Sequence, residues 1–227
     1  GKQGEEKAMA RQATPFPEDC IVFDTETTGL EVENGHRLLE FGGIRMRGGV
    51  PTNETLHLYI NPERKVDPEA VKVHGITNEF LADKPRFTDV AQKILDFLGD
   101  MPLIAHNAEF DIGFINTELT RAGYPEIPKD RFIDSLAVAK KKFPGSPTSL
   151  NALCKRFKIS IDDREKHGAL IDSELLAEVC VQMNGGRQRS IFQMLDSPAP
   201  GQHTASTERQ EKAQTHARER RILQIGR

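Results

Sequence analysis

Apolar residues follow two kinds of pattern along this chain. Short apolar or alternating runs bounded by Gly, Pro and charged residues predict β-strands, whereas apolar residues spaced by three and four positions predict helices. The predicted strands cover residues 20–25, 37–47, 52–60, 102–106 and 131–134, with Gly48 and Gly49 near the turn of a hairpin formed by the second and third. The predicted helices cover residues 67–73, 88–98, 109–122, 135–142, 149–156 and 169–183. A β-meander followed by alternating strands and helices is typical of an α/β domain with a mixed sheet.

The periodic pattern ends near residue 185, where Gly185 and Gly186 predict a helix stop. The chain of 227 residues therefore predicts one domain, residues 19–185, between two polar ends. Residues 1–18 are expected to be a flexible leader, and residues 186–207 include a linker rich in Pro, Ser, Thr, Gly and Ala. Residues 208–227 are a charged tail that cannot form a core of its own.

Composition narrows the class of protein. A formal net charge of −3 argues against a general polyanion binder. The small basic clusters at 140–142 and 155–158 are then either solvated faces or contacts to phosphates. Three cysteines without metal-ligand spacing predict reduced thiols, two of them in apolar patterns. No apolar run approaches ~20 residues and no signal peptide is visible, so we expect a cytoplasmic protein with no membrane contact.

The segment DTETT carries the first candidate chemistry. Asp24 and Glu26 follow the apolar run at 20–23, and residues two apart on a strand project from the same face. Two carboxylates held so close repel unless one is protonated or a cation lies between them. Hard oxygen ligands suit magnesium or manganese. The alternative is a strand end that runs into a solvated turn, and further acids downstream decide between the two.

Two further acids lie in suitable settings. Asp111 falls in the first turn of a predicted helix, with Asn107 as its N-cap, where the helix dipole favours an anion. Asp172 lies in an otherwise apolar helical stretch. His167 lies five residues earlier, which would be about 140° away on one helix. If both face one site, His167 must precede the helix start, and Gly168 makes that bend easy.

The segments FDTETTG, HNAEFD and HGALID, in this order, resemble the three motifs of the DnaQ-like (DEDDh) 3′→5′ exonucleases. The resemblance covers roughly residues 19–185 and includes the stretches at 66–76, 133–145 and 149–159, which are most similar to the proofreading epsilon-subunit branch of bacterial DNA polymerase III. It implies a ribonuclease H-like α/β fold, with a mixed five-stranded sheet and helices on both faces.

The resemblance also implies roles for individual residues. Two divalent ions, Mg²⁺ or Mn²⁺, would be held by Asp24, Glu26, Asp111 and Asp172, with Asp24 bridging both ions and Asp111 reaching the second directly or through water. His167 would be the general base. Asp24, Glu26 and Asp172 would also meet the substrate, together with Leu30, Glu69 and His74. The alternative for Leu30 is simple core packing, and for Glu69 and His74 it is an ordinary amphipathic turn with a satisfied histidine. His106 and Asn107 would shape the site, with a structural rather than catalytic role for His106.

Beyond the domain, Gln188–Phe192 resembles the short peptide by which polymerase III subunits bind the sliding clamp. An extended segment of this kind offers Gln188 to a polar spot and Ile191 with Phe192 to an apolar pocket. The alternative is that Ile191 and Phe192 cover the edge of the domain. By resemblance the tail at 208–227 would bind the polymerase III alpha subunit, and the alternative is a disordered tail.

Three functions follow from these observations. The leading hypothesis is a proofreading exonuclease that acts on DNA 3′ ends, single-stranded or frayed. Its enzyme-class rival is a free-standing relative that trims RNA or acts in DNA repair. A catalytically silent binding module is the third, and it would be expected to lack an acid or the histidine, none of which is missing. The clamp-like peptide and the linker favour the first.

Overall fold

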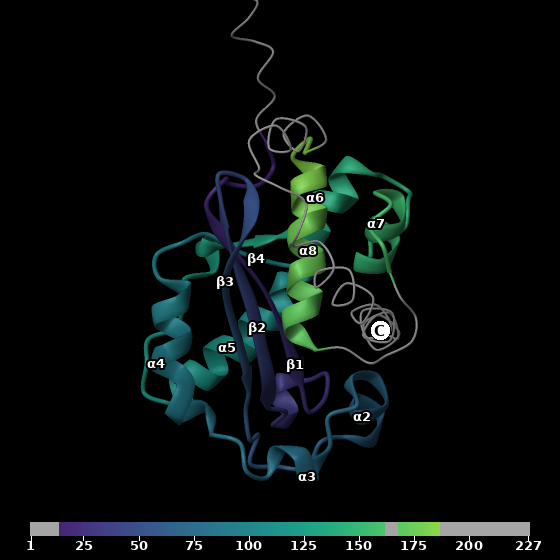
Figure 1. The fold of residues 1–227 in the computed structure, drawn as a ribbon. Helices are drawn as coiled ribbons and strands as arrows, with labels where there is room; N and C mark the ends of the chain where they lie inside the picture. The colour runs from purple at the N-terminus through teal and green to yellow at the C-terminus, as the bar shows by residue number, and fades with distance from the viewer. Residues whose placement is uncertain (1–13, 162–167, 187–227) are drawn as a thin grey trace, which may run out of the picture.

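The sheet at the centre of the protein has five strands. The computed structural model describes residues 14–161 and 168–186. The strands are β1 (Cys20–Thr27), β2 (Leu38–Arg47), β3 (Val50–Tyr59), β4 (Leu103–Ala105) and β5 (Phe132–Asp134). Their order is β3-β2-β1-β4-β5, with β1–β2 and β2–β3 antiparallel and β1–β4 and β4–β5 parallel, so the sheet is mixed (Figure 1).

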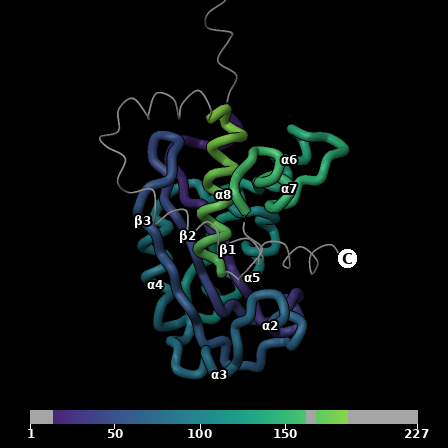
Figure 2. The backbone as a smooth tube through the Cα atoms, turned by 45° about the vertical axis from the view of Figure 1, so that its right-hand side comes forward, coloured from purple at the N-terminus to yellow at the C-terminus, as the bar shows by residue number. Residues whose placement is uncertain are grey.

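Helices cover both faces of this sheet. The long helix α8 (Ala169–Met183) crosses one face, with α6 (Ser135–Lys142) and α7 (Leu150–Arg156) beside it. The other face is covered by α4 (Phe87–Leu98) and α5 (Ala108–Arg121). Figure 2 shows α8 in front of the strands, with α2 (Pro68–His74) and α3 (Asn78–Leu81) at the lower end of the sheet. Two 3-10 turns, η1 (Val32–Asn34) and η2 (Lys129–Arg131), complete the described elements.

The alternation of β1 explains why the two faces have separate cores. Cys20 and Val22 belong to the cluster under α8, whereas Ile21 and Phe23 belong to the cluster under α4 and α5. Each is at most 1% exposed, so β1 is a central strand buried on both sides. Continuing the alternation, Asp24 and Glu26 face α8, and Thr25 faces α5.

The predicted mixed sheet with helices on both faces is confirmed, and most predicted boundaries lie within two residues of the observed ones. The short helix α3 and the two 3-10 turns were not predicted, because such short elements carry no periodicity. α8 ends at Met183, and Gly185 adopts a φ of 83°, which confirms the predicted helix stop.

The three cysteines are buried thiols, as the spacing predicts. Burial, with a smaller effect of Asp19, raises the pKa of Cys20 to about 12. Burial also raises the pKa of Cys180 well above its usual value. These thiols therefore stay protonated and act as small apolar side chains. Among the described helices, none has the length and apolar character needed to cross a bilayer.

Candidate active site

Three carboxylates converge where β1 meets α8. Asp24 and Glu26 project from β1 toward α8, and Asp172 lies in the first turn of that helix. One oxygen from each of the three lies within 4.8 Å of the others. Glu26 and Asp172 are each 2% exposed, so the cluster is largely shielded from water. The structure thus brings together three of the four acids that the motifs predict.

This donor set fits a divalent cation. Three carboxylates at such distances repel strongly in a buried setting unless a cation or protons balance them. Both oxygens of Asp172 are buried, as are Oδ2 of Asp24 and Oε1 of Glu26, so bulk water does little to screen the repulsion. Carboxylate oxygens are the ligands that Mg²⁺ and Mn²⁺ favour. The cluster therefore has the chemistry of a metal site.

Asp111 approaches the same strand from the opposite face. It lies in the first turn of α5, as predicted, and is 2% exposed. Its Oδ1 accepts a hydrogen bond from Thr25 Oγ1 at 2.5 Å. Since Thr25 stands between Asp24 and Glu26 in β1, Asp111 is anchored to the strand that carries two of the clustered acids, although it lies outside the three-acid cluster.

Replacing Thr25 with valine is expected to destabilise the protein by about 1.5–3 kcal/mol, the value of a hydrogen bond to a charged group. Valine keeps the shape and the β-branched side chain but leaves the buried Asp111 carboxylate without this donor. Serine at the same position retains the hydroxyl and serves as the control. Chemical denaturation of the three proteins measures the effect, and equal stability of the valine and serine variants would count against it.

His74 joins the end of α2 to the end of β1. It is 5% exposed, and its Nδ1 accepts from the backbone N–H of Ile76 at 3.0 Å. Its Nε2 therefore carries the proton and donates to the carbonyl of Thr27 at 3.1 Å. Because Thr27 follows Glu26, this bond fixes the backbone directly beside a clustered acid.

The other two residues predicted to contact the terminal nucleotide, Glu69 and Leu30, lie at or near the protein surface. Glu69, on the outer side of α2, forms an exposed ion pair with Lys72 at 3.0 Å. Leu30 follows the β1 motif and is partly exposed, so part of its side chain is available for contact with a ligand. Their roles toward a terminal nucleotide remain predictions.

His106 and Asn107 stand between β4 and α5. Both ring nitrogens of His106 are engaged, Nδ1 with Ser135 Oγ at 2.9 Å and Nε2 with the carbonyl of Thr148 at 2.9 Å. This geometry ties α6 and the segment before α7 to the site. Asn107 occupies the N-cap position but adopts a left-handed φ of 69° without a side-chain cap bond, and its N–H donates to Asp134 Oδ1 at 2.9 Å. The predicted position is right, but the side chain makes no cap bond, since Asn107 adopts a left-handed conformation instead of the extended one usual for an N-cap.

Several predicted residues lie outside the described part of the chain. His167, the predicted base, immediately precedes Gly168, the N-cap of α8. Helix α8 therefore begins after His167, as the spacing of His167 and Asp172 requires. The clamp-like residues Gln188, Ile191 and Phe192 also lie outside the described residues, as do 1–13 and 187–227 of the predicted leader, linker and tail.

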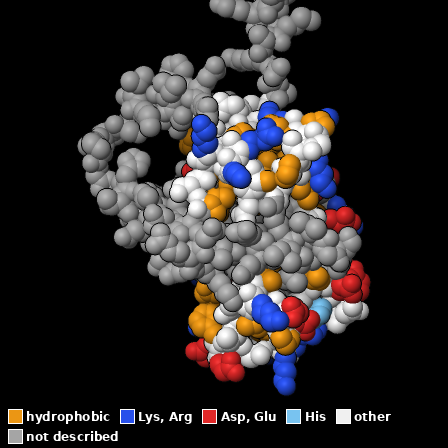
Figure 3. Space-filling view, turned by 90° about the vertical axis from the view of Figure 1, so that its right-hand side faces the viewer, with side chains coloured by type: hydrophobic (Ala, Val, Ile, Leu, Met, Phe, Trp, Pro, Cys, Tyr) orange, Lys and Arg blue, Asp and Glu red, His pale blue; other side chains and the backbone are white. Residues whose placement is uncertain are grey.

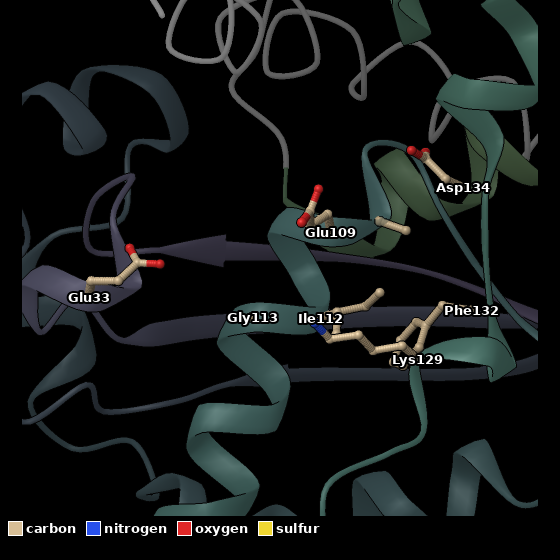
Figure 4. A pocket seen from close by; sticks show the side chains of 8 residues that line it. Glu33, Glu109, Ile112, Gly113, Lys129, Phe132 and Asp134 are labelled. Carbon is tan, nitrogen blue, oxygen red and sulfur yellow. The ribbon is translucent and has the colours of Figure 1, made fainter.

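A pocket of about 440 Å³ lies along α5, beginning beside its first turn. Figure 4 shows the carboxylates of Glu33 and Asp134 on opposite sides of the view, with Glu109 between them. The acids do not converge on one point, which distinguishes this groove from the cluster on β1. It is lined by Glu33, Ala108, Glu109, Ile112, Gly113, Lys129, Phe132 and Asp134.

The two basic clusters are exposed on α6 and α7. Figure 3 shows Lys and Arg side chains gathered on the upper part of one face, where α6 and α7 lie in Figure 1. Arg156 stacks over the Phe143 ring at 4.1 Å, so it is held in place rather than freely solvated. A contact between these side chains and phosphates stays a prediction.

Motif reasoning overlooks two polar residues near the acids. Thr25 lies inside the motif, but strand alternation places its side chain on the face opposite Asp24 and Glu26. Its hydrogen-bond partner on that face, Asp111, is apparent only from the fold. Glu40 is an acid within the apolar run of β2 and is 0% exposed. A buried acid in an apolar strand usually has a buried partner, so its position is itself a signal. The three motifs do not include Glu40.

Comparison with solved structures agrees with the geometry. Exonuclease X in complex with 5′ overhanging duplex DNA is 28% identical, covers 73% of this chain and 91% of that one, and superposes with a TM-score of 0.59. The nuclease domain of 3′hExo, a DEDDh family member bound to rAMP, is 21% identical over 75% of this chain and 94% of that one, with a TM-score of 0.61. The sheet and these likenesses define a ribonuclease H-like exonuclease fold, and its acidic cluster has the donor set of a divalent-metal site.

Sequence comparison is more specific. The family model described as Exonuclease matches residues 21–180. The DNA polymerase III subunit epsilon of Rickettsia typhi is 51% identical over 181 residues, 78% of this chain and 79% of the relative. That of Escherichia coli is 43% identical over 197 residues, 83% of this chain and 81% of the relative. The chain belongs to the DNA polymerase III epsilon subunits of this exonuclease family and is a 3′→5′ exonuclease.

Proposed function

We propose that this chain removes nucleoside 5′-monophosphates from DNA 3′ ends as the proofreading subunit of a replicative polymerase in the bacterial cytoplasm. The observation that carries the proposal is the cluster of Asp24, Glu26 and Asp172, largely shielded from water and with one oxygen of each within 4.8 Å of the others, on the fold of an exonuclease. Similarity to polymerase III epsilon subunits supports polymerase III as the assembly. The complex of Exonuclease X with duplex DNA supports DNA as the substrate.

The four acids would bind two divalent ions. Asp24, Glu26 and Asp172 would hold one divalent ion, Mg²⁺ or Mn²⁺. Asp24 would also hold a second ion, which Asp111 would reach directly or through water. Such a pair of ions, when bound, activates the attacking water and neutralises charge on the scissile phosphate and leaving oxygen. The Thr25 hydroxyl orients Asp111, and His74 fixes the β1 backbone beside Glu26.

The protein supplies the remaining groups. His167 would accept the proton of the attacking water as a neutral imidazole. Leu30 would contact the terminal base, and Glu69 with His74 would lie near the terminal nucleotide. Lys and Arg side chains on α6 and α7 would contact phosphates of the approaching strand. A terminal nucleotide must leave its duplex to enter this site, which favours mispaired ends because they fray more easily.

The test compares DNA and RNA oligonucleotides of one sequence, each with a free or a blocked 3′ end, with Mg²⁺ or Mn²⁺. We expect stepwise release of deoxynucleoside monophosphates from the free DNA 3′ end only when a divalent ion is present. A DNA substrate with a mispaired 3′ end should be cut faster than its matched counterpart. Faster cleavage of RNA than of DNA would instead identify an RNA-trimming relative.

Binding to the sliding clamp has a separate test. Replacing Ile191 and Phe192 together with alanine should weaken clamp binding by at least about 30-fold, because one hot-spot anchor alone carries about 2 kcal/mol or more. Nuclease activity on a short single strand should not change, since both residues lie outside the exonuclease domain. The affinity is measured by binding of the full-length chain to surface-immobilised clamp. Clamp binding that is indifferent to the double substitution would remove this proposed contact.

A further inference from the structure

Glu40 is a fourth carboxylate on the α8 face of the sheet. It is 0% exposed and lies on β2 directly opposite Glu26 in the antiparallel register. Opposite residues on neighbouring strands share a face, with Cβ atoms about 4.5–5.5 Å apart. Glu40 is therefore a buried neighbour of the clustered acids without being one of the three.

Donors from two elements satisfy the Glu40 carboxylate. Its Oε1 accepts the backbone N–H of Ala169 at 2.8 Å, and its Oε2 lies 2.6 Å from His57 Nε2. Tyr59 lies directly opposite Glu40 on β3. Burial first, and then the negative charge of Glu40, raise the pKa of Tyr59 to about 12, so this phenol stays neutral.

The bond to Ala169 joins Glu40 to the helix that carries Asp172. Ala169 is the first residue of α8, and Asp172 lies three positions later on the same side of the helix. A carboxylate at a helix N-terminus is favourable both as a hydrogen-bond acceptor and toward the helix dipole. The place at which Ala169 is held therefore sets where the Asp172 side chain enters the cluster.

Two glycines allow this close approach. A methyl group on Gly42 of β2 would overlap the backbone of Ala169 and Leu170. A methyl group on Gly168 would overlap the carboxylate of Glu40 itself. Gly168 has an ordinary φ of −97°, so alanine would fit its backbone and only the clash opposes it.

We propose that Glu40 is a positioning residue for Asp172: it holds the first turn of α8 against β2 so that Asp172 reaches the cation shared with Asp24 and Glu26. The inference rests on the proposed metal site and deepens it. Partners that orient metal ligands typically contribute 10–100-fold to metal affinity or activity. We expect Glu40 to act in that range, through metal affinity and kcat rather than through the KM for the oligonucleotide.

The experiment measures Mn²⁺ affinity by electron paramagnetic resonance and, separately, kcat and KM. Glu40→Leu removes both acceptors and should weaken Mn²⁺ binding by about 10–100-fold. Glu40→Gln keeps a carbonyl oxygen for the Ala169 N–H and should retain most of the affinity. Glu54→Gln makes the same chemical change at an exposed glutamate of β3 and should match the wild type.

Gly168→Ala tests the same contact with Glu40 intact. The added methyl should displace the carboxylate and weaken Mn²⁺ binding as Glu40→Leu does. In a Glu40→Ala background the clash is absent, so Gly168→Ala should then add little, and this non-additivity identifies the pair as coupled. If Glu40→Leu fails to fold, Gly168→Ala alone carries the test.

The outcomes separate the inference from the proposed function. Failure of the wild type to bind Mn²⁺ would contradict the metal site itself. A wild type that binds, with Glu40→Leu and Gly168→Ala binding Mn²⁺ equally well and keeping kcat, would overturn the positioning role even if both melt at lower temperature. Weaker Mn²⁺ binding by both variants, with affinity largely retained in Glu40→Gln, supports it.

Discussion

Replacing Asp172 with asparagine is expected to slow nucleotide release by more than about 100-fold, since a ligand should matter at least as much as the partners that orient ligands. Asparagine has nearly the same shape, so packing at the start of α8 should not change. Without metal, the substitution removes one of three closely spaced like charges, two of them buried, so the variant should be as stable as the wild type or more stable. Loss of activity would then not be a loss of fold.

Thermal unfolding with and without Mn²⁺ checks this reasoning. A cation that binds only the folded state adds stability that grows with the logarithm of its free concentration relative to its Kd, so the wild type should gain stability that Asp172→Asn does not. Glu178→Gln makes the same change farther along α8, at a glutamate whose pKa burial raises, and should leave activity unchanged. An Asp172→Asn protein that still cleaves at the wild-type rate would contradict the ligand assignment.

Sequence periodicity predicts the elements well because most are long and separated by clear breaks. The predicted helix at 169–183 coincides with α8, where an apolar stretch ends at Asn184 and Gly185. Strand β1 is longer than the predicted 20–25 because its last residues pair with β2, and such pairing depends on a partner that one segment does not reveal. The four-residue α3 is too short to show a period.

Part of the site can likewise be predicted from the sequence, and part cannot. Alternation along β1 places Asp24 and Glu26 on one face, and the motif resemblance adds Asp172, so this cluster follows from the sequence. The hydrogen bond from Thr25 to Asp111 joins residues 86 positions apart, and the bond from Ala169 to Glu40 joins residues 129 apart. Contacts of that range arise only when the sheet and both helix layers are assembled. The clustered acids can therefore be found from sequence motifs, whereas the groups that hold them in place cannot.

Replacing His167 with alanine is expected to lower kcat by about 10²–10⁴-fold, the usual contribution of a general base. The clustered acids remain, so Mn²⁺ affinity should stay close to that of the wild type. His167 directly precedes the N-cap of α8 in the sequence and lies five residues before Asp172, so the helix start that places Asp172 is also the point from which His167 extends.

The pH dependence distinguishes a base from a residue that merely shapes the site. A base must be neutral, so the wild-type rate should fall as the pH drops through the pKa of the histidine, ordinarily ~6.5, and this limb should disappear in His167→Ala. Added imidazole should restore part of the lost rate, because it supplies a base of the same kind. Weakened Mn²⁺ binding with the rate retained would instead assign His167 to the metal and leave the proton of the attacking water to another group.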